Sequence, residues 1–347
     1  MNTLKKLLIF LIVSFKLSLY IINETITTNP LIMYLYVLVI FLLALPTILN
    51  LKFDKSSFIK TMTILVISFI MFILYKEDNI FLYAIIALMT LDDDNKEMIK
   101  IFFWSSLMIY IITLFLGACG YLQVDDVYRT IDGTSAVRNS LGFANANAVF
   151  TYFVPIVLSG IYLYGKSNFF TVIVFLSATV LFSYCKSRTG YYLTLFILFT
   201  NLFSKQQWIL KIKHRQFLFC FIVSLLIACC FGISEYNSVN QLLSYRPWYY
   251  LQFLKQGPFV WGGGLSEHMV LDNLYFHLLA YYSIIGFGLY YYIFTEGLLL
   301  NKEPKIAFIS FFFLSYGIFE AVTIANFTIV IFLKESFLKY RGEENND

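Results

Sequence analysis

Four arginines in three polar segments are the residues of this sequence best suited to chemistry on a polyanion. They are Arg129 and Arg138 in 123–140, Arg188 in 185–190 and Arg246 in 235–270. Arginine makes planar, bidentate and permanently charged contacts with phosphate or carboxylate groups. Gathered on one face, these arginines suit a ligand such as a diphosphate. For Arg129, which lies close to several aspartates, local ion pairs in a solvated loop are the alternative.

Acidic and imidazole side chains near the last of these arginines are candidate proton acceptors. Glu267, His268 and Asp272 follow Arg246 in the same polar region of the chain. The spacing of four residues predicts that His268 and Asp272 share one face of a helix. A carboxylate or imidazole in such a place can take a proton from a reacting hydroxyl.

Amide and aromatic side chains in these segments suit the binding of a neutral ligand. Asn145 and Asn147 follow Arg138 at the start of an apolar run, where they suit either ligand binding or helix capping. Tyr245 and Trp248 suit either stacking on sugar rings or an aromatic belt at a membrane interface. Arg188 separates two apolar runs, so we expect it to face the protein interior and to mark function, with lipid headgroups as its alternative partners.

Membrane-spanning helices must position these residues. The sequence is 59% hydrophobic and only 13% charged, against about 25% charged residues in soluble proteins. Long continuous apolar runs predict helices rather than the alternating strands of a barrel. The predicted fold is therefore all-α, a single transmembrane domain over 1–347 with about 10–12 spans. The runs are 7–22, 31–50, 58–75, 80–91, 99–121, 141–164, 168–184, 190–204, 216–234, 272–300, 306–319 and 321–333.

The distribution of lysine and arginine predicts how these spans are oriented. With the N-terminus in the cytoplasm, seventeen basic residues fall in inner segments and seven in outer ones, as the positive-inside rule requires. Both termini are then cytoplasmic, and the segments 122–140 and 235–270 become outer loops that carry the predicted active site. This topology accounts for the net charge of +4, so nucleic acid is not an expected partner. No cysteine spacing for zinc, Walker loop or nucleophile elbow occurs, and we expect no metal and no cofactor.

Several short motifs, taken in order, resemble those of the repeat-unit polymerases of O-antigen and capsular polysaccharide (Wzy-type polymerases) and of the related O-antigen ligases. The likeness covers about residues 100–335. Its motifs are Arg138-Asn139-Ser140-Leu141-Gly142-Phe143, Ser187-Arg188-Thr189-Gly190, Arg246 with Gly257 ten residues beyond it, Gly262-Gly263-Gly264 and Leu271-Asp272-Asn273-Leu274-Tyr275. The chain departs from the ligases and some polymerases at Asp272, where they carry a histidine.

The resemblance implies a multi-pass glycosyltransferase with GT-C-like architecture in the bacterial cytoplasmic membrane. It would join polyprenyl-diphosphate-linked oligosaccharide units into a surface polysaccharide, beside a flippase and a chain-length regulator as partners. Its residues would take three roles. Arg188 and Arg246, then Arg138, would hold the diphosphate; Asp272, then His268, would take the acceptor proton; and Asn145, Asn147, Asn273 and Tyr275 would bind sugar or orient the base.

Three other functions remain open on the sequence. An O-antigen-ligase-like transferase would use the same chemistry on another acceptor. A transporter or flippase of the lipid-linked unit would carry charged residues at mid-membrane and show internal repeats. A membrane scaffold or sensor would not need four arginines on the outer face.

Overall fold

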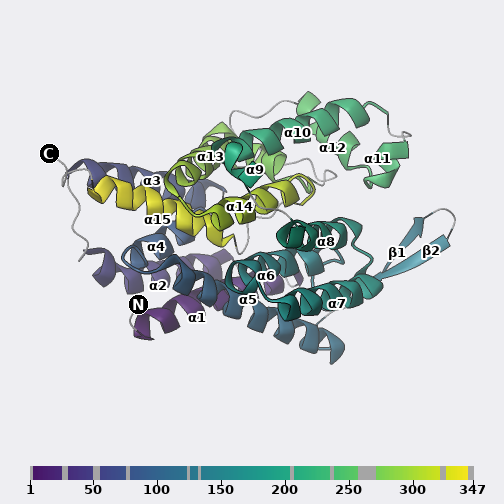
Figure 1. Cartoon of the computed structure of the whole chain (residues 1–347), viewed down its shortest axis with the longest axis horizontal. Coiled ribbons are helices and arrows are strands. Elements are labelled where there is room, and N and C mark those ends of the chain that lie inside the picture. The colour runs from purple at the N-terminus through teal and green to yellow at the C-terminus, as the bar shows by residue number, and fades with distance from the viewer. Residues whose placement is uncertain are drawn as a thin grey trace. The chain divides into compact units, whose positions relative to one another are not determined.

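Helices make up most of the computed structural model, which describes residues 3–25, 30–49, 55–75, 79–122, 126–131, 134–203, 207–234, 238–256, 271–320 and 326–342. The elements are drawn in Figure 1. They are α1 (Thr3–Thr25), α2 (Pro30–Leu49), α3 (Lys55–Tyr75), α4 (Asn79–Met89), α5 (Asn95–Ala118), β1 (Asp126–Ile131), β2 (Thr134–Asn139), α6 (Ala148–Tyr164), α7 (Asn168–Cys185), α8 (Arg188–Phe203), α9 (Gln207–Lys211), η1 (Lys213–Arg215), α10 (Gln216–Phe231), α11 (Ser238–Leu242), α12 (Arg246–Gln256), α13 (Leu274–Leu300), α14 (Pro304–Tyr316) and α15 (Phe327–Gly342).

Each predicted span overlaps one of these helices, although the last, 321–333, overlaps α15 only from Phe327 onward. Among the described residues, four helical segments are long and apolar enough to cross a membrane: Asn95–Ala118, Asn168–Cys185, Lys213–Phe231 and Leu274–Leu300. Shorter apolar helices, including Asn79–Met89 and Ala148–Tyr164, accompany them. The chain therefore has the helices of a membrane protein, as its composition predicts.

Three segments differ from the prediction. The segment predicted as the outer loop 122–140 contains an antiparallel hairpin, in which Val127 pairs with Arg138 and Ile131 with Thr134, so the fold is not entirely α-helical. The second predicted loop, 235–270, contains α11 and α12. The predicted span 141–164 begins as a helix only at Ala148, because turns occupy 141–147.

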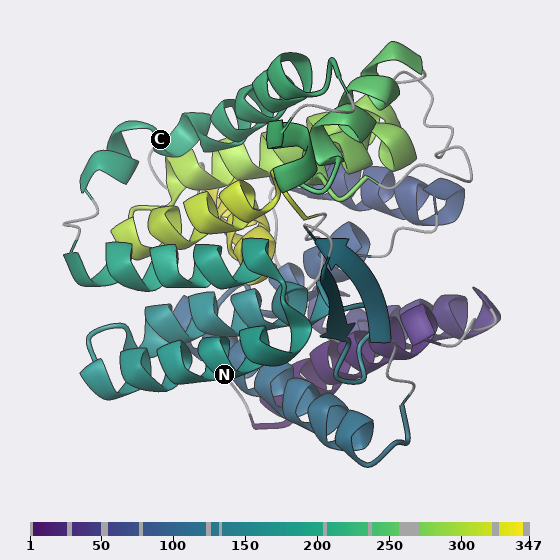
Figure 2. The same cartoon turned by 90° about the vertical axis from the view of Figure 1, so that its right-hand side faces the viewer.

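The helices form two compact units, each made of two stretches of chain, where the sequence predicts one domain. The first unit comprises Met1–Leu49 and Asp92–Lys205, and the second comprises Asn50–Leu91 and Gln206–Asp347. In the first unit α5 packs between α1 and α6, and α6, α7 and α8 pack on one another. Figure 2 shows α7 and α8 side by side there, with the hairpin close to the end of α7.

In the second unit, two helices from distant parts of the chain pack against a short buried helix. Every residue of α4 is buried, and α3 and α15 both pack against it. α13 packs against α15 and α10, and α10 also packs against α12 and α14. In the turn that follows α14, Gly317 O accepts a backbone hydrogen bond from Leu274 N at 2.7 Å. This bond ties the end of α14 to the start of α13.

The longest helix is interrupted in its middle. Ser283 of α13 has φ 61° and ψ −175°, a conformation that is essentially confined to glycine. Its side-chain oxygen accepts a hydrogen bond from Ile285 N at 3.2 Å. The break divides α13 into two helical halves, both of them apolar.

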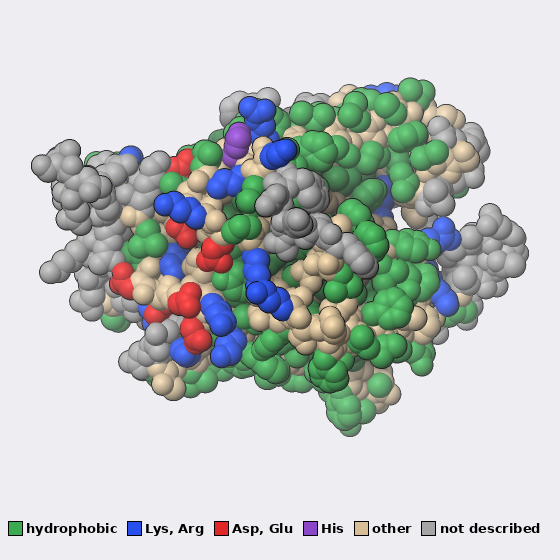
Figure 3. Space-filling model, viewed as in Figure 1, with side chains coloured by type: hydrophobic (Ala, Val, Ile, Leu, Met, Phe, Trp, Pro, Cys, Tyr) green, Lys and Arg blue, Asp and Glu red, His purple; other side chains and the backbone are tan. Residues whose placement is uncertain are grey.

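The surface of the molecule separates charge from apolar side chains. Lys5 pairs with Asp93, and Lys6 pairs with Glu97 at 2.5 Å. On the face drawn in Figure 3, charged side chains gather in one broad patch and apolar side chains cover much of the remaining described surface. By contrast, α7 exposes large apolar side chains such as Phe169 and Leu176. An exposed apolar helix face of this kind is suited to lipid.

Candidate functional site

Arg246 is the first residue of α12 and is held there by an unusual turn. Ser244 and Tyr245 precede it with φ values of 62° and 63°, which cost roughly 1–3 kcal/mol for each residue other than glycine. Tyr245 N donates to Asn240 O at 2.8 Å, and Trp248 N donates to the Asn240 side-chain oxygen at 3.1 Å. Asn240 therefore holds both the turn and the first turn of α12.

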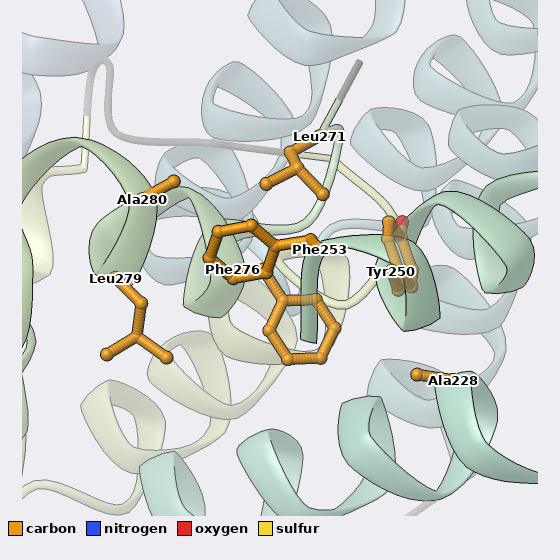
Figure 4. Packing of buried hydrophobic residues seen from close by; sticks show 7 residues of the cluster. All are labelled: Ala228, Tyr250, Phe253, Leu271, Phe276, Leu279 and Ala280. Carbon is orange, nitrogen blue, oxygen red and sulfur yellow. The ribbon is translucent and has the colours of Figure 1, made fainter. Parts of the chain in front are cut away.

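An apolar cluster fixes α12 against α13 below this turn. Figure 4 shows its residues, which are Ala228, Tyr250, Phe253, Leu271, Phe276, Leu279 and Ala280. The Phe276 ring lies 5.3 Å from the Tyr250 ring and 6.0 Å from the Phe253 ring, centroid to centroid. Because the cluster is buried, the start of α12 has a fixed position relative to the start of α13.

Arg246 forms ion pairs with two carboxylates, and we call these three residues the acidic triad. Its Nε and Nη2 donate to Oδ2 of Asp272 at 3.1 and 2.9 Å. Nη2 also donates to Oε1 of Glu320 at 2.7 Å. The side chain of Asp272 is 32% exposed, whereas those of Arg246 and Glu320 are 11% and 8% exposed. No described residue hydrogen-bonds Oδ1 of Asp272, so this oxygen is the open group of the triad.

Asn273 places the two carboxylates by joining three elements. Its side-chain oxygen caps α13 by accepting from Tyr275 N and Phe276 N at 3.0 and 3.1 Å. Its amide group donates to Ser224 Oγ of α10 at 2.9 Å and to Ile318 O at 2.8 Å. Asp272 and the segment that ends in Glu320 are therefore attached to the same amide.

The electrostatics of the triad favour a charged arginine. Burial alone disfavours the charged guanidinium, but Glu320 and Asp272 outweigh it and raise the pKa of Arg246. Burial raises the pKa of the Tyr250 phenol in the same helix, and its hydroxyl donates to Ile318 O at 3.4 Å. With both carboxylates ionised, the triad carries one net negative charge, so Arg246 is not available as an excess cation for a diphosphate.

The structure changes the expectations for the residues around Asp272. Asp272 lies outside α13, because the helix begins at Leu274 after its cap Asn273. The prediction that Asp272 shares a helix face with His268 is therefore wrong, since Asp272 is not in a helix. Asn273 and Tyr275 are fully buried. The Tyr275 hydroxyl donates to Leu314 O at 2.8 Å. Both side chains are bonded inside the protein and are not placed to touch a sugar.

The other residues predicted in this region have mixed outcomes. His268 and Glu267 lie outside the described residues, together with the glycines of 257–264. Tyr245 is 37% exposed. Trp248 is partly buried, with its ring in edge contact with Tyr249 at 5.1 Å. Sugar contact by Tyr245 and Trp248 stays a prediction.

In the first unit, Arg138 joins the hairpin to the corner between α7 and α8. Its Nε donates to Cys185 O at 3.1 Å, and its Nη2 donates to Oδ1 of Asn147 at 2.6 Å. The Ser187 hydroxyl donates to the same Asn147 oxygen at 3.2 Å. Arg138 and Ser187, which come from different motifs of the sequence, therefore share one amide oxygen.

The structure distinguishes the two amides that open α6. The Asn145 side-chain oxygen accepts from Asn147 N and Ala148 N, each at 2.9 Å, so Asn145 caps the helix. Asn147 instead bonds Arg138 and Ser187. Gly142, in the turn before them, has φ 87° and packs so closely on α5 that a Cβ on it would lie 2.9 Å from Gly117 Cα.

Arg188 is a predicted site residue whose side chain is open to a ligand. It is exposed at the first position of α8, which contradicts the expectation that it faces the protein interior. Its guanidinium makes no hydrogen bond or ion pair with any described residue. Lys186 ends α7 with φ 53° and lies over the Phe182 ring at 5.9 Å. The α7–α8 corner therefore exposes two neighbouring positive charges.

Arg129 lies in β1 opposite Ala136, and its side chain is outside the described part of the structure. Arg138 and Arg188 belong to the first unit and the acidic triad to the second. Among the described residues, no three His, Cys, Asp or Glu side chains group closely enough to hold a metal ion. Comparisons of the chain with protein-family models, with curated proteins and with solved structures found no match.

Proposed function

We propose that this protein is a membrane glycosyltransferase that polymerises polyprenyl-diphosphate-linked oligosaccharide units into a surface polysaccharide at the outer face of the cytoplasmic membrane. The observation that carries the proposal is the open Oδ1 of Asp272. A carboxylate that is fixed through one oxygen and open at the other, with about a third of its side chain exposed, is arranged like a general base.

The proposed reaction transfers a glycosyl group to a sugar hydroxyl. The acceptor hydroxyl donates its proton to Oδ1 of Asp272 while its oxygen forms a bond to the anomeric carbon of the donor. The bond from that carbon to the diphosphate oxygen breaks, and the diphosphate leaves with the electron pair. Positive charge near the leaving group stabilises the transition state without a metal ion.

The contacts revise the roles that the sequence suggests for the arginines. Arg246 already binds two carboxylates, so in this proposal it orients Asp272. Arg188 is exposed and has no ion pair with a described residue, which makes it the arginine best suited to a phosphate group. Arg138 bonds the α7–α8 corner and Asn147, so it supports the segment that carries Arg188.

A transporter of the lipid-linked unit is the second candidate, because α13 is discontinuous at Ser283. Interrupted membrane helices are typical of the substrate sites of transporters. A ligase-like transferase uses the same base and differs in its acceptor.

The test is an assay of the purified full chain with a polyprenyl-diphosphate-linked oligosaccharide and no other enzyme. We expect a ladder of products one repeat apart, formed in the presence of a chelator. Products on a different acceptor only would indicate a ligase-like enzyme. Movement of the intact lipid across a vesicle membrane without a ladder would indicate a transporter and contradict the proposal.

The Asp272→Asn variant tests the assignment of the base. It keeps the shape of the side chain and removes its proton acceptor, so we expect turnover to fall by a factor of about 10²–10⁴. The matched control is Glu296→Gln, which neutralises a carboxylate farther along α13 and is expected to keep wild-type activity. Full activity of Asp272→Asn would exclude Asp272 as the base.

A further inference from the structure

Glu320 is the member of the acidic triad that has no role in the reaction proposed above. Its side chain is 8% exposed, and its Oε1 lies 2.7 Å from Nη2 of Arg246. Its backbone N–H donates to Tyr316 O at 3.0 Å, which continues the last turn of α14. The carboxylate is therefore buried in a fixed position, and burial of a charge is unfavourable unless the charge is paired.

The geometry of the Arg246–Asp272 pair is unusual because it uses only one carboxylate oxygen. An arginine and a carboxylate commonly form two parallel hydrogen bonds, one to each oxygen. Here both Nε and Nη2 bond Oδ2 of Asp272, at 3.1 and 2.9 Å. Nη2 is shared with Glu320, so the guanidinium is drawn toward Glu320 and does not reach Oδ1.

We propose that Glu320 is a positioning residue that keeps Oδ1 of Asp272 open by holding Arg246 away from it. The inference rests on the proposed function for its catalytic meaning, since the open oxygen is the one that would take the acceptor proton. Without the charge of Glu320, Arg246 turns toward Asp272 and bonds both of its oxygens. Arg246 then occupies Oδ1 of Asp272, and this oxygen can no longer accept the proton of the acceptor hydroxyl.

The surroundings of the triad leave no other described charged group for this role. Among the residues that the structure describes, Glu320, Asp272 and Tyr250 are charged or titratable groups that act on Arg246. Tyr250 is buried, and its hydroxyl bonds Ile318 O. α10 contributes Ser224, which is not titratable and bonds Asn273. Glu320 alone therefore competes with Asp272 for Arg246 among the residues that the structure describes.

The test compares Glu320→Gln and Glu320→Asp in the full-length protein with two readouts. Gln keeps the size of the side chain and removes its charge, whereas Asp keeps the charge. In the polymerisation assay we expect Glu320→Gln to lower kcat by about ten- to a hundredfold with little change in KM, because a general base contributes to the chemical step. Glu320→Asp is expected to restore most of the loss. A Gln variant with wild-type kcat would overturn the inference.

The second readout needs no substrate. Infrared difference spectra of protein labelled with ¹³C-aspartate, with Asp272→Asn as the blank, give the carboxylate stretches of Asp272. We expect Glu320→Gln to move these bands to the positions of a carboxylate bonded at both oxygens, and Glu320→Asp to leave them in place. Bands that do not move in the Gln variant would contradict the role of Glu320.

If Glu320→Gln does not fold, the wild-type spectrum still tests the geometry on which the inference depends. Bands of a carboxylate bonded at one oxygen support the inference, and bands of a carboxylate bonded at both oxygens overturn it. Because the spectra do not depend on turnover, they also separate the two proposals. A protein that gives the expected spectra but no ladder of products would support the positioning role of Glu320 and contradict the proposed polymerase activity.

Discussion

Arg188 and Arg246 differ in what already surrounds their guanidinium groups. Arg246 is buried and bound to Asp272 and Glu320, and its charge is more than balanced. Arg188 is exposed at the start of α8. From the sequence the two arginines appear equivalent, because each lies in a short polar segment. Their partners lie far away along the chain, and only the fold separates an orienting arginine from one that is open to a ligand.

The Arg188→Ala variant tests whether the exposed arginine binds the substrate. Loss of a hydrogen bond to a charged group is worth about 1.5–3 kcal/mol, so we expect kcat/KM for the lipid-linked donor to fall by about ten- to a hundredfold. Lys186→Ala is the matched control, since it removes a neighbouring exposed charge. Equal losses in both variants would mean that surface charge, and not a specific contact, attracts the substrate.

The residue that the sequence does not single out is Glu320. It appears there as one acid in an apolar run, 74 residues beyond Arg246. Asp272 is recognisable because it follows a polar segment with other candidate bases. Asn273 and Tyr275, next to it, have equally suitable side chains, but the capping of α13 and the contact with Leu314 use their polar groups. Asp272 differs from Asn273 and Tyr275 in how far its side chain is buried, and a sequence pattern carries no information on burial.

At the scale of elements, the contact of α8 with α6 places the α7–α8 corner. Gly190 lies in the first turn of α8, and a Cβ on it would overlap the Cβ of Phe150 in α6. The close approach brings Ser187 within 3.2 Å of Asn147 Oδ1. The glycine of the Ser187–Gly190 motif is therefore explained by packing.

A pair of glycine substitutions tests this contact. Gly190→Ala forces α8 away from α6, and overpacking of this kind costs about 1–3 kcal/mol, so we expect a lower midpoint of thermal unfolding. Gly288→Ala is the control, because no atom lies within 4 Å of a Cβ at that position and alanine favours a helix by about 1 kcal/mol. A midpoint that is lower for Gly288→Ala than for Gly190→Ala would contradict the packing explanation.

The sequence predicts the positions of the helices well and the hairpin not at all. Apolar runs of about 20 residues leave little choice of structure in a membrane, and each run has its helix. The hairpin β1–β2 had one signal, since the dipeptide Asp132-Gly133 is typical of two-residue hairpin turns. The segments on either side of this dipeptide do not alternate between apolar and polar residues, and their charged residues favour a loop.

At the scale of the whole molecule, the chain enters each of its two units twice. The helices of 50–91 belong with the C-terminal part of the chain, and those of 92–205 belong with the N-terminal part. Hydropathy gives the order of the spans and contains no information on which of them pack together. The division into units could not be predicted from one sequence for this reason.

The predicted orientation is tested at the same scale. A reporter that is active only in the cytoplasm, fused after Asp347, is expected to be active, because the basic residues favour a cytoplasmic C-terminus. The same reporter inserted after Gln256 is expected to be silent, and alkaline phosphatase at that place is expected to be active. Activity of alkaline phosphatase fused after Asp347 would contradict this orientation and indicate an odd number of membrane crossings.

The long interval between Arg246 and Glu320 has a consequence for biogenesis. During synthesis Arg246 leaves the ribosome well before either carboxylate, and Glu320 follows only after α13 and α14 have been made. Until Glu320 follows, Asp272 is the one carboxylate of the triad that can pair with Arg246. The ion pair between Arg246 and Glu320 therefore forms late. It joins α12, which is made first, to the last turn of α14.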